Sequence, residues 1–149
     1  MQTVKSILEK KTFVASVTKE SPVLDAVEVM DKRNIGSLVV TDGDKVVGIF
    51  TERDALKRIL AKGLDPAKTA VDAVMTAPVA VCRPDTSLDE CTEVMTRKRI
   101  RHLPVVSKGK LVGIVTSGDI LAQQVVQHAE TIEYLNQYMF GPTPSTDEG

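Results

Sequence analysis

The stretch GIFTERD, Gly48–Asp54, returns sixty-five positions later as GIVTSGD, Gly113–Asp119. Sliding the chain against itself by 65 positions aligns Val14–Leu56 with Val79–Leu121 without a gap, and fifteen of these 43 pairs are identical. Internal repeats on this scale fix the architecture of a protein before any single motif is interpreted. The sequence is therefore a duplication, and each copy places a Thr and an Asp three apart, directly after an apolar run.

The first copy predicts the order β-α-β-β-α. Phe13–Val17 reads as a short apolar strand. Ser21 as N-cap and Pro22 at the first helical position then begin a helix with apolar residues at 3–4 spacing. The TDGD turn between two apolar runs predicts a hairpin. A second helix is expected from Thr51 to near Gly63.

The second copy repeats this order, with a strand at Pro78–Cys82 and a helix that starts at Thr86, with Asp89 three residues on. A hairpin around SKG and a helix from Thr116 follow. One unit of about 50–60 residues buries too little surface to be comfortable alone. We therefore expect an α/β (α+β) module of two repeats packed by pseudo-twofold symmetry, with Asp65–Ala77 as a linker that contains a short helix.

The expected boundaries are 1–66 for repeat 1 with an N-terminal helix and 67–128 for repeat 2. An amphipathic C-terminal helix over 129–140 and a disordered tail over 141–149 complete the chain. The apolar stripes of the two end segments either lie across their own module or belong to a subunit interface.

The amino-acid composition excludes several classes of function. Lys and Arg number 19 against 20 acids, so no basic field favours nucleic acid or a membrane surface. No apolar run is long enough to span a bilayer, and no signal-peptide pattern opens the chain. Cys82 and Cys91 lack metal or disulfide spacing, and we interpret them as small buried residues in preference to a redox pair. The expectations are a cytoplasmic location, no metal, no catalytic residues and no enzymatic activity.

The repeated Thr-x-x-Asp has two interpretations. A Thr at the N-cap with an acid three residues on resembles a capping box, which satisfies backbone N–H groups at the start of a helix. The same corner, where a strand passes into a helix, attracts anions because N–H groups point outward and the helix dipole is positive there. A Thr hydroxyl can donate to phosphate, and a carboxylate can accept from a ribose diol. The same residues can serve in both roles.

The duplicated unit, IGSLVV and IRHLPVV after the first helix, and VGIFTERD and VGIVTSGD at the second, resemble a tandem pair of cystathionine β-synthase (CBS) domains, a Bateman module. The resemblance covers roughly Val4 to His128. It implies two clefts for adenosine compounds such as AMP, ADP, ATP, NAD or S-adenosylmethionine, no catalytic cofactor, and a homodimer. The implied residues of cleft 1 are Ala15, Ile35, Gly36, Ser37, Thr51, Arg53 and Asp54; those of cleft 2 are Ala80, Ile100, Arg101, His102, Ile114, Thr116, Gly118 and Asp119.

The resemblance implies that Asp54 and Asp119 hold ribose, and that Thr51 and Thr116 hold phosphate or ribose. The copies differ at the phosphate end, where Arg101 and His102 replace Gly36 and Ser37. Arg offers a fork of donors suited to phosphate, so we expect cleft 2 to prefer a phosphorylated ligand. The favoured function is a nucleotide sensor that acts on a partner protein in trans. The alternative is a structural or interaction homodimer with vestigial clefts.

Overall fold

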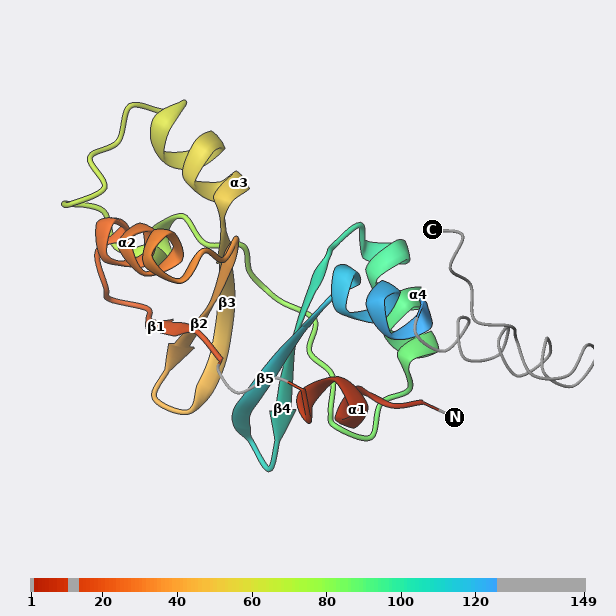
Figure 1. The fold of residues 1–149 in the computed structure, drawn as a ribbon. Coiled ribbons are helices and arrows are strands. Elements are labelled where there is room, and N and C mark those ends of the chain that lie inside the picture. The colour runs from red at the N-terminus through yellow and green to blue at the C-terminus, as the bar shows by residue number, and fades with distance from the viewer. Residues whose placement is uncertain (1, 11–13, 126–149) are drawn as a thin grey trace, which may run out of the picture.

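In the computed structural model, which describes residues 2–10 and 14–125, the chain folds as two α+β halves joined by a linker (Figure 1). The first half holds β1 (Ser16–Thr18), α2 (Val23–Arg33), β2 (Ser37–Asp42), β3 (Lys45–Thr51), α3 (Glu52–Asp54) and the helical segment η1 (Ala55–Leu60). The second half holds α4 (Leu88–Lys98), β4 (His102–Ser107) and β5 (Lys110–Thr116), followed by a helix over residues 117–125. α1 (Val4–Leu8) precedes the first half, and the linker contains the short helix η2 (Val71–Ala73). The predicted α+β class with two repeats is confirmed.

The two hairpins are built alike. β2 and β3 pair antiparallel from Ser37 opposite Thr51, and β4 and β5 pair from His102 opposite Thr116. Both hairpins break register at equivalent places, after Val40 and after Val105. A bulge bends its strand at a fixed point, and the two hairpins therefore bend alike. The antiparallel pairing places the start of the first hairpin strand beside the end of the second in each repeat.

The first strands of the two repeats differ, and the predicted strand over Pro78–Cys82 is wrong. β1 runs parallel to β2, and the Val39 N–H donates to the Ala15 carbonyl at 3.2 Å. Pro104 occupies the position equivalent to Val39 and has no N–H to donate. Only an isolated bridge between Cys82 and Val105 remains. Of the strand expected over Phe13–Val17, Ser16 and Val17 lie in β1, which extends to Thr18, whereas Val14 and Ala15 precede it.

Both first helices begin one residue later than predicted. Ser21 does not cap α2, since Pro22 is the N-cap and Val23 the first helical residue; the Ser21 hydroxyl instead lies 2.9 Å from that of Thr18. Likewise Thr86 does not begin α4, because Ser87 is the N-cap and its hydroxyl accepts from the Glu90 N–H at 3.1 Å. The hydroxyl that caps α4, that of Ser87, thus lies one residue beyond Thr86, whereas the N-cap of α2 is a proline.

The helix predicted from Thr51 to Gly63 forms with a different internal geometry. After one α turn the backbone widens into the π-helical segment Ala55–Leu60, where the Ala61 N–H reaches the Leu56 carbonyl at 2.9 Å. The equivalent residues after Thr116 stay α-helical through residue 125. The two repeats therefore differ in helix geometry directly after the repeated Thr-x-x-Asp. Such π geometry is uncommon and is often found at functional sites.

Each half is completed by the segment that precedes the other half. Val4 and Ile7 of α1 are buried in the core of the second half, although they come before the first in sequence. Figure 1 shows α1 beside the β4–β5 hairpin. Val71 and Val74 of the linker are buried in the core of the first half. The two cores are separate, and the halves contact each other through β3 and β5.

The exchanged segments are held by matching backbone bonds. The Val71 N–H donates to the Ser21 carbonyl at 2.8 Å, and the Val4 N–H donates to the Thr86 carbonyl at 2.9 Å. Ser21 and Thr86 are equivalent in the repeat, so α1 and the linker segment are structural counterparts despite a two-residue difference in spacing. The residues predicted as a C-terminal helix (129–140) and tail (141–149) lie outside the described part of the chain.

Candidate functional site

The two strand-to-helix corners that carry the repeated motif are formed by backbone pairing. In the first, called corner 1, β2 begins beside the end of β3, and the Glu52 N–H donates to the Gly36 carbonyl at 3.0 Å. In corner 2 the Ser117 N–H donates to the Arg101 carbonyl at 2.9 Å. Corner 1 comprises Gly36, Ser37, Thr51, Glu52 and Asp54, and corner 2 comprises Arg101, His102, Thr116, Ser117 and Asp119. The structure therefore brings the predicted residues at the start of the first hairpin strand of each repeat together with its Thr-x-x-Asp motif.

Both Thr-x-x-Asp motifs form capping boxes. In corner 1 the Asp54 N–H donates to the Thr51 hydroxyl at 3.2 Å, and the Thr51 N–H donates to the Asp54 carboxylate at 3.1 Å. In corner 2 the corresponding bonds between Thr116 and Asp119 measure 3.0 and 2.9 Å. The capping interpretation is thus realised in both copies. Since each carboxylate has two oxygens and four acceptor sites, capping leaves acceptor capacity at both corners.

Asp54 is additionally bound to the linker. The Thr76 hydroxyl lies 3.1 and 3.2 Å from the two Asp54 oxygens, and Arg58 Nε lies 3.6 Å from one of them. Arg58 in turn donates to the carbonyls of Val74 and Met75 at 3.2 and 2.9 Å. Asp54 is only 6% exposed, whereas Asp119 is half-buried. Corner 1 is therefore the more closed of the two.

The remaining predicted residues divide between the cores and the surface. Ala15 and Ile35 pack in or against the first core, and Ala80 and Ile100 pack against the second. The other predicted positions are more accessible: Arg53 and Gly118 are exposed and Ile114 is half-buried. Arg53 is an exposed residue of α3, and its place in the site rests on the family resemblance.

The phosphate ends of the two corners differ in charge. Arg101 is exposed and His102 half-buried at the start of β4. At the equivalent place in corner 1, a Cβ on Gly36 would lie 3.3–3.6 Å from the carboxyl group of Glu52. The residue equivalent to Glu52 in corner 2 is Ser117. Corner 1 thus presents an acid where corner 2 presents a cation and a hydroxyl.

Sequence reasoning missed Glu52 and Thr76. Glu52 lies inside the quoted GIFTERD stretch, and its replacement by Ser117 in the second copy was a visible signal of an electrostatic difference. Thr76 had no such signal, because it belongs to the linker and only the fold brings it against Asp54.

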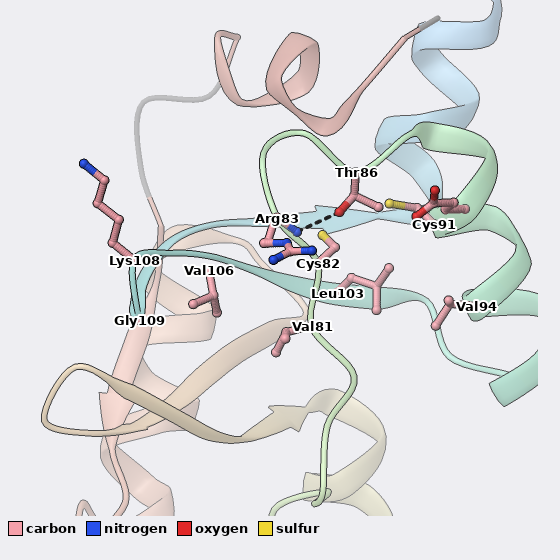
Figure 2. A pocket seen from close by; sticks show the side chains of 11 residues that line it. Val81, Cys82, Arg83, Thr86, Cys91, Val94, Leu103, Val106, Lys108 and Gly109 are labelled. Carbon is pink, nitrogen blue, oxygen red and sulfur yellow. Dashed lines mark hydrogen bonds between the residues drawn. The ribbon is translucent and has the colours of Figure 1, made fainter.

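A cavity of about 670 Å³ lies between α4 and β4 and reaches the turn of the β4–β5 hairpin (Figure 2). Its lining includes Cys82, Arg83, Cys91, Leu103, Lys108 and Gly109. The cavity therefore follows β4 from Leu103, next to His102 of corner 2, to the turn at Lys108 and Gly109. The volume lies within the range of about 300–1,000 Å³ usual for small-molecule sites.

Residues 2–10 and 14–125 contain no group of three His, Cys, Asp or Glu side chains placed to hold a metal ion. They also contain no helix of the length and apolarity needed to cross a bilayer.

Two repeats of β-α-β-β-α-like order, the second with its first strand reduced to a single bridge, form a duplicated α+β module with a capped strand-to-helix corner in each repeat. The CBS domain model matches residues 4–61 and 71–125, and the chain belongs to the CBS domain family. Members of this family that stand alone as paired CBS domains are regulatory proteins.

Solved structures support the same fold. A protein with CBS domains from Burkholderia ambifaria is 39% identical with a TM-score of 0.78, over 84% of this chain and 95% of that one. The CBS domain pair of protein MJ0100, solved in complex with 5′-methylthioadenosine and S-adenosyl-L-methionine, is 29% identical with a TM-score of 0.76, over 85% of this chain and 98% of that one.

Among curated relatives, the mitochondrial CBS domain-containing protein CBSX3 of Arabidopsis thaliana is 35% identical over 129 residues. The match covers 83% of this chain and 63% of CBSX3. The chain therefore spans less than two thirds of the length of this relative.

Proposed function

We propose that the protein is a regulatory module that binds an adenosine-containing ligand at its two corners and signals to a partner protein in trans, without catalysing a reaction itself. The observation that carries the proposal is the repeated capping box, in which a hydroxyl and a carboxylate lie at a helix N-terminus beside the start of a paired strand. The carboxylate can accept hydrogen bonds from a ribose diol, and phosphate oxygens can accept hydrogen bonds from the backbone N–H groups and the hydroxyl. The adenosine compounds bound by the CBS pair of MJ0100 support this class of ligand.

We further propose that corner 2 is the tighter site for phosphorylated ligands such as AMP, ADP, ATP or NAD. Arg101 supplies a guanidinium fork at the phosphate end, and His102 adds a second polar group. Asp119 is less buried than Asp54 and is therefore easier for a ribose to reach. In corner 1, Glu52 repels phosphate, and the ligand must also compete with Thr76 for Asp54.

Thermal melting with AMP, ADP, ATP, NAD, NADH and S-adenosylmethionine tests the function. A ligand at 100 times its Kd stabilises the folded chain by about 2.7 kcal/mol, which raises the Tm by roughly 5–10 °C for a domain of this size. If no member of the panel at millimolar concentration moves the Tm, the structural alternative with vestigial corners replaces the sensor.

Titration calorimetry with matched variants tests the site. Arg101→Ala is expected to weaken binding of phosphorylated ligands roughly 10–100-fold, the worth of a charge-assisted hydrogen bond. Arg97→Ala is the control, because it removes the same charge from the exposed last turn of α4, where Arg97 pairs with Glu93 at 3.5 Å. Equal losses from Arg101→Ala and Arg97→Ala would remove Arg101 from the site.

A substitution of Asp119 requires a control for the loss of helix capping. Asp119→Ala removes both a cap and the proposed ribose acceptor, whereas Ser87→Ala removes only the N-cap of α4. Both changes are expected to cost about 1 kcal/mol of stability, but only Asp119→Ala is expected to abolish binding at corner 2. Unchanged affinity in Asp119→Ala would leave the motif with capping alone.

We also propose a homodimer, because each helix that follows a corner exposes an apolar face. Leu56 and Leu60 in η1 are 58% and 71% exposed, and their repeat equivalents Leu121 and Val125 are 61% and 57% exposed. Four large apolar side chains at equivalent positions suit a self-complementary interface. Because these two helices begin at the corners, each one connects a proposed ligand site to the proposed subunit contact.

A cytoplasmic location belongs to the proposal as well. It rests on the sequence, in which Cys82 and Cys91 lack the spacing of a disulfide framework.

A further inference from the structure

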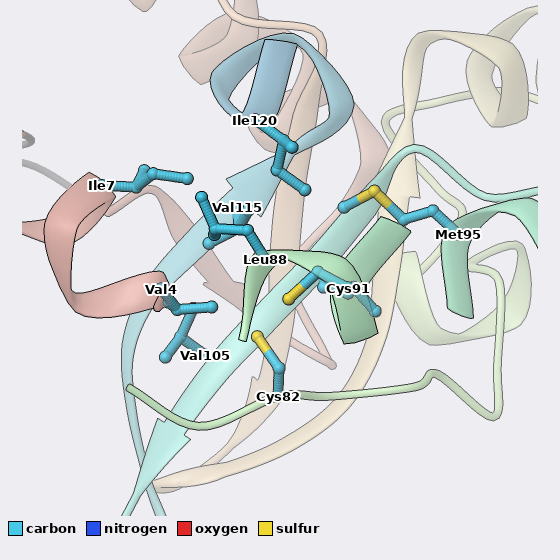
Figure 3. Packing of buried hydrophobic residues seen from close by; sticks show 10 residues of the cluster. Val4, Ile7, Cys82, Leu88, Cys91, Met95, Val105, Val115 and Ile120 are labelled. Carbon is cyan, nitrogen blue, oxygen red and sulfur yellow. The ribbon is translucent and has the colours of Figure 1, made fainter. Parts of the chain in front are cut away.

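The two cysteines of the chain lie together, although the fold brings them from different elements. Cys82 belongs to the segment beside β4, and Cys91 lies on α4. In Figure 3 their sulfur atoms point toward each other across the second core, and Figure 2 shows the same pair at the wall of the cavity. They are the only two cysteines in the sequence.

Backbone hydrogen bonds hold both cysteines in place. The Cys82 N–H donates to the Pro104 carbonyl at 2.9 Å, and its carbonyl accepts from the Val106 N–H at 2.8 Å. The Cys91 N–H donates to the Ser87 carbonyl at 3.1 Å in the first turns of α4. The thiols are therefore presented to each other by a sheet edge and a helix, so their proximity does not depend on a loose loop.

Both thiols form part of the wall of the cavity. Cys82 is 6% exposed and Cys91 1% exposed, and both line the cavity of about 670 Å³. Arg83 and Lys108 line it too, against the single acid Glu90. Cations near a cysteine favour its thiolate, whereas apolar burial opposes it. A small oxidant therefore has to enter the wall of the cavity to reach the two sulfur atoms.

The two thiols are also unequal. The hydrogen bond that Cys82 gives to Cys91 lowers the pKa of the Cys91 thiol, against the opposing effects of burial and of Glu90. The same hydrogen bond, together with burial, raises the pKa of Cys82. This hydrogen bond therefore favours ionisation of Cys91 over that of Cys82.

We propose that Cys82 and Cys91 form an oxidisable dithiol that a small hydroperoxide converts reversibly into an intramolecular disulfide. The Cys91 thiolate attacks one peroxide oxygen, the O–O bond breaks, and the departing oxygen takes up a proton and leaves as water or an alcohol. The resulting Cys91 sulfenic acid is then attacked by Cys82 sulfur, which forms the S–S bond and releases water. With hydrogen peroxide, two thiols and one peroxide give one disulfide and two waters, and a dithiol reductant reverses the change.

The disulfide would tie the sheet edge to α4 across the loop between residues 82 and 91. This loop carries Thr86 and Ser87, which hold α1 in place through the Val4 N–H and the Thr3–Ser87 bridge. Oxidation therefore acts on the wall of the cavity and on the anchor of α1. Disulfides of reducing compartments are characteristically transient and redox-sensing.

The experiment oxidises the reduced full-length chain with hydrogen peroxide and maps the bond by mass spectrometry. Trypsin leaves both cysteines in residues 69–97, because Arg83 is followed by Pro84. Cleavage before Asp72, Asp85, Asp89 and Asp119 instead separates residues 72–84 from 89–118. We expect these two peptides to be joined, the intact chain to be lighter by two hydrogen atoms, and free thiols in denaturant to fall from two to none. Dithiothreitol is expected to restore both thiols and to reverse a rise in Tm.

Single variants test the order of the steps. In Cys82→Ala the Cys91 sulfenic acid has no partner and is expected to be trapped by dimedone, whereas Cys91→Ala is expected to leave Cys82 unlabelled. Two free thiols after oxidation, bonds only between chains, or sulfonic acids without a disulfide would overturn the proposal. Dimedone on Cys82 in Cys91→Ala would overturn the assignment of Cys91 as the attacking thiol. Should a variant fail to fold, the peptide map of the unaltered chain still decides whether the bond forms.

Discussion

Gly48 of β3 is covered directly by Met75 of the linker, whose sulfur occupies the place where a Cβ on Gly48 would be built. In the second half Leu8 of α1 covers Gly113 in the same way. The glycines of the quoted motif are therefore needed for close packing, since each repeat receives the segment that precedes the other. A side chain at position 48 has to displace Met75, and one at position 113 has to displace Leu8.

Alanine at the two glycines should have unequal effects. Gly113→Ala meets only the flexible end of Leu8, whereas Gly48→Ala also meets the Thr76 carbonyl at 3.0 Å, which is backbone. Overpacking costs about 1–3 kcal/mol, and we expect Gly48→Ala to lie at the upper end of that range. Denaturant unfolding measures both. Adding Leu8→Ala should relieve Gly113→Ala more fully than Met75→Ala relieves Gly48→Ala, and equal relief would contradict the backbone contact.

The exchange of segments predicts crosswise destabilisation. Val4→Ala and Val71→Ala each delete two methyl groups from a fully buried site, at a cost of about 2 kcal/mol. Hydrogen exchange should show faster opening of β4 and β5 in Val4→Ala, and of β2 and β3 in Val71→Ala. Loss of protection in the half that is adjacent in sequence would show that the packing partners are assigned wrongly.

The duplication made most of the fold predictable. Because the repeat is gap-free, one copy checks the other, and the hairpins, the helices and the paired corners follow from periodicity and turn residues. The one-residue errors at the starts of α2 and α4 were local, whereas the larger errors arose where partners are distant in sequence. The strand expected at Pro78–Cys82 is reduced because Pro104, more than twenty residues later, cannot donate to it. The membership of Val4 in the second core likewise has no local signal.

The candidate site was predictable in its residue types and less so in its bonding. The Thr-x-x-Asp spacing alone indicated a capping box, and both boxes form. The closing of corner 1 by Thr76 depends on where the linker returns to the fold, which no pattern in GIFTERD contains. The pairing of Cys82 with Cys91 is similar: their spacing favoured inert core residues, and only the packing of α4 against the sheet edge turns the sulfurs together.

The exposed apolar faces predict the effect of a charge on assembly. Leu60→Glu or Leu121→Glu should raise the dissociation constant of the proposed dimer roughly 100-fold, because about 1.5 kcal/mol per buried Leu counts twice across a twofold interface. Light scattering over a dilution series measures the change. Val112→Glu on β5 is the control, because Val112 is also exposed, at 44%, but lies outside these helices. Loss of the dimer in all three variants would point to a general effect of charge.

The charge difference between the corners predicts a gain of function. Glu52→Ser gives corner 1 the residue found in corner 2 and removes the carboxylate beside Gly36. Removing one exposed repulsive charge is worth about 0.5–1 kcal/mol, so AMP should bind corner 1 roughly two- to fivefold more tightly while adenosine binds unchanged. Calorimetry in the Arg101→Ala background, in which ligand binding at corner 2 is weakened, measures AMP binding at corner 1 separately. Glu20→Ser, just beyond the end of β1 and so at the opposite end of the sheet, removes the same charge and should have no effect. A similar gain for adenosine would mean that Glu52 blocks entry by its size, and the electrostatic account of the asymmetry would fail.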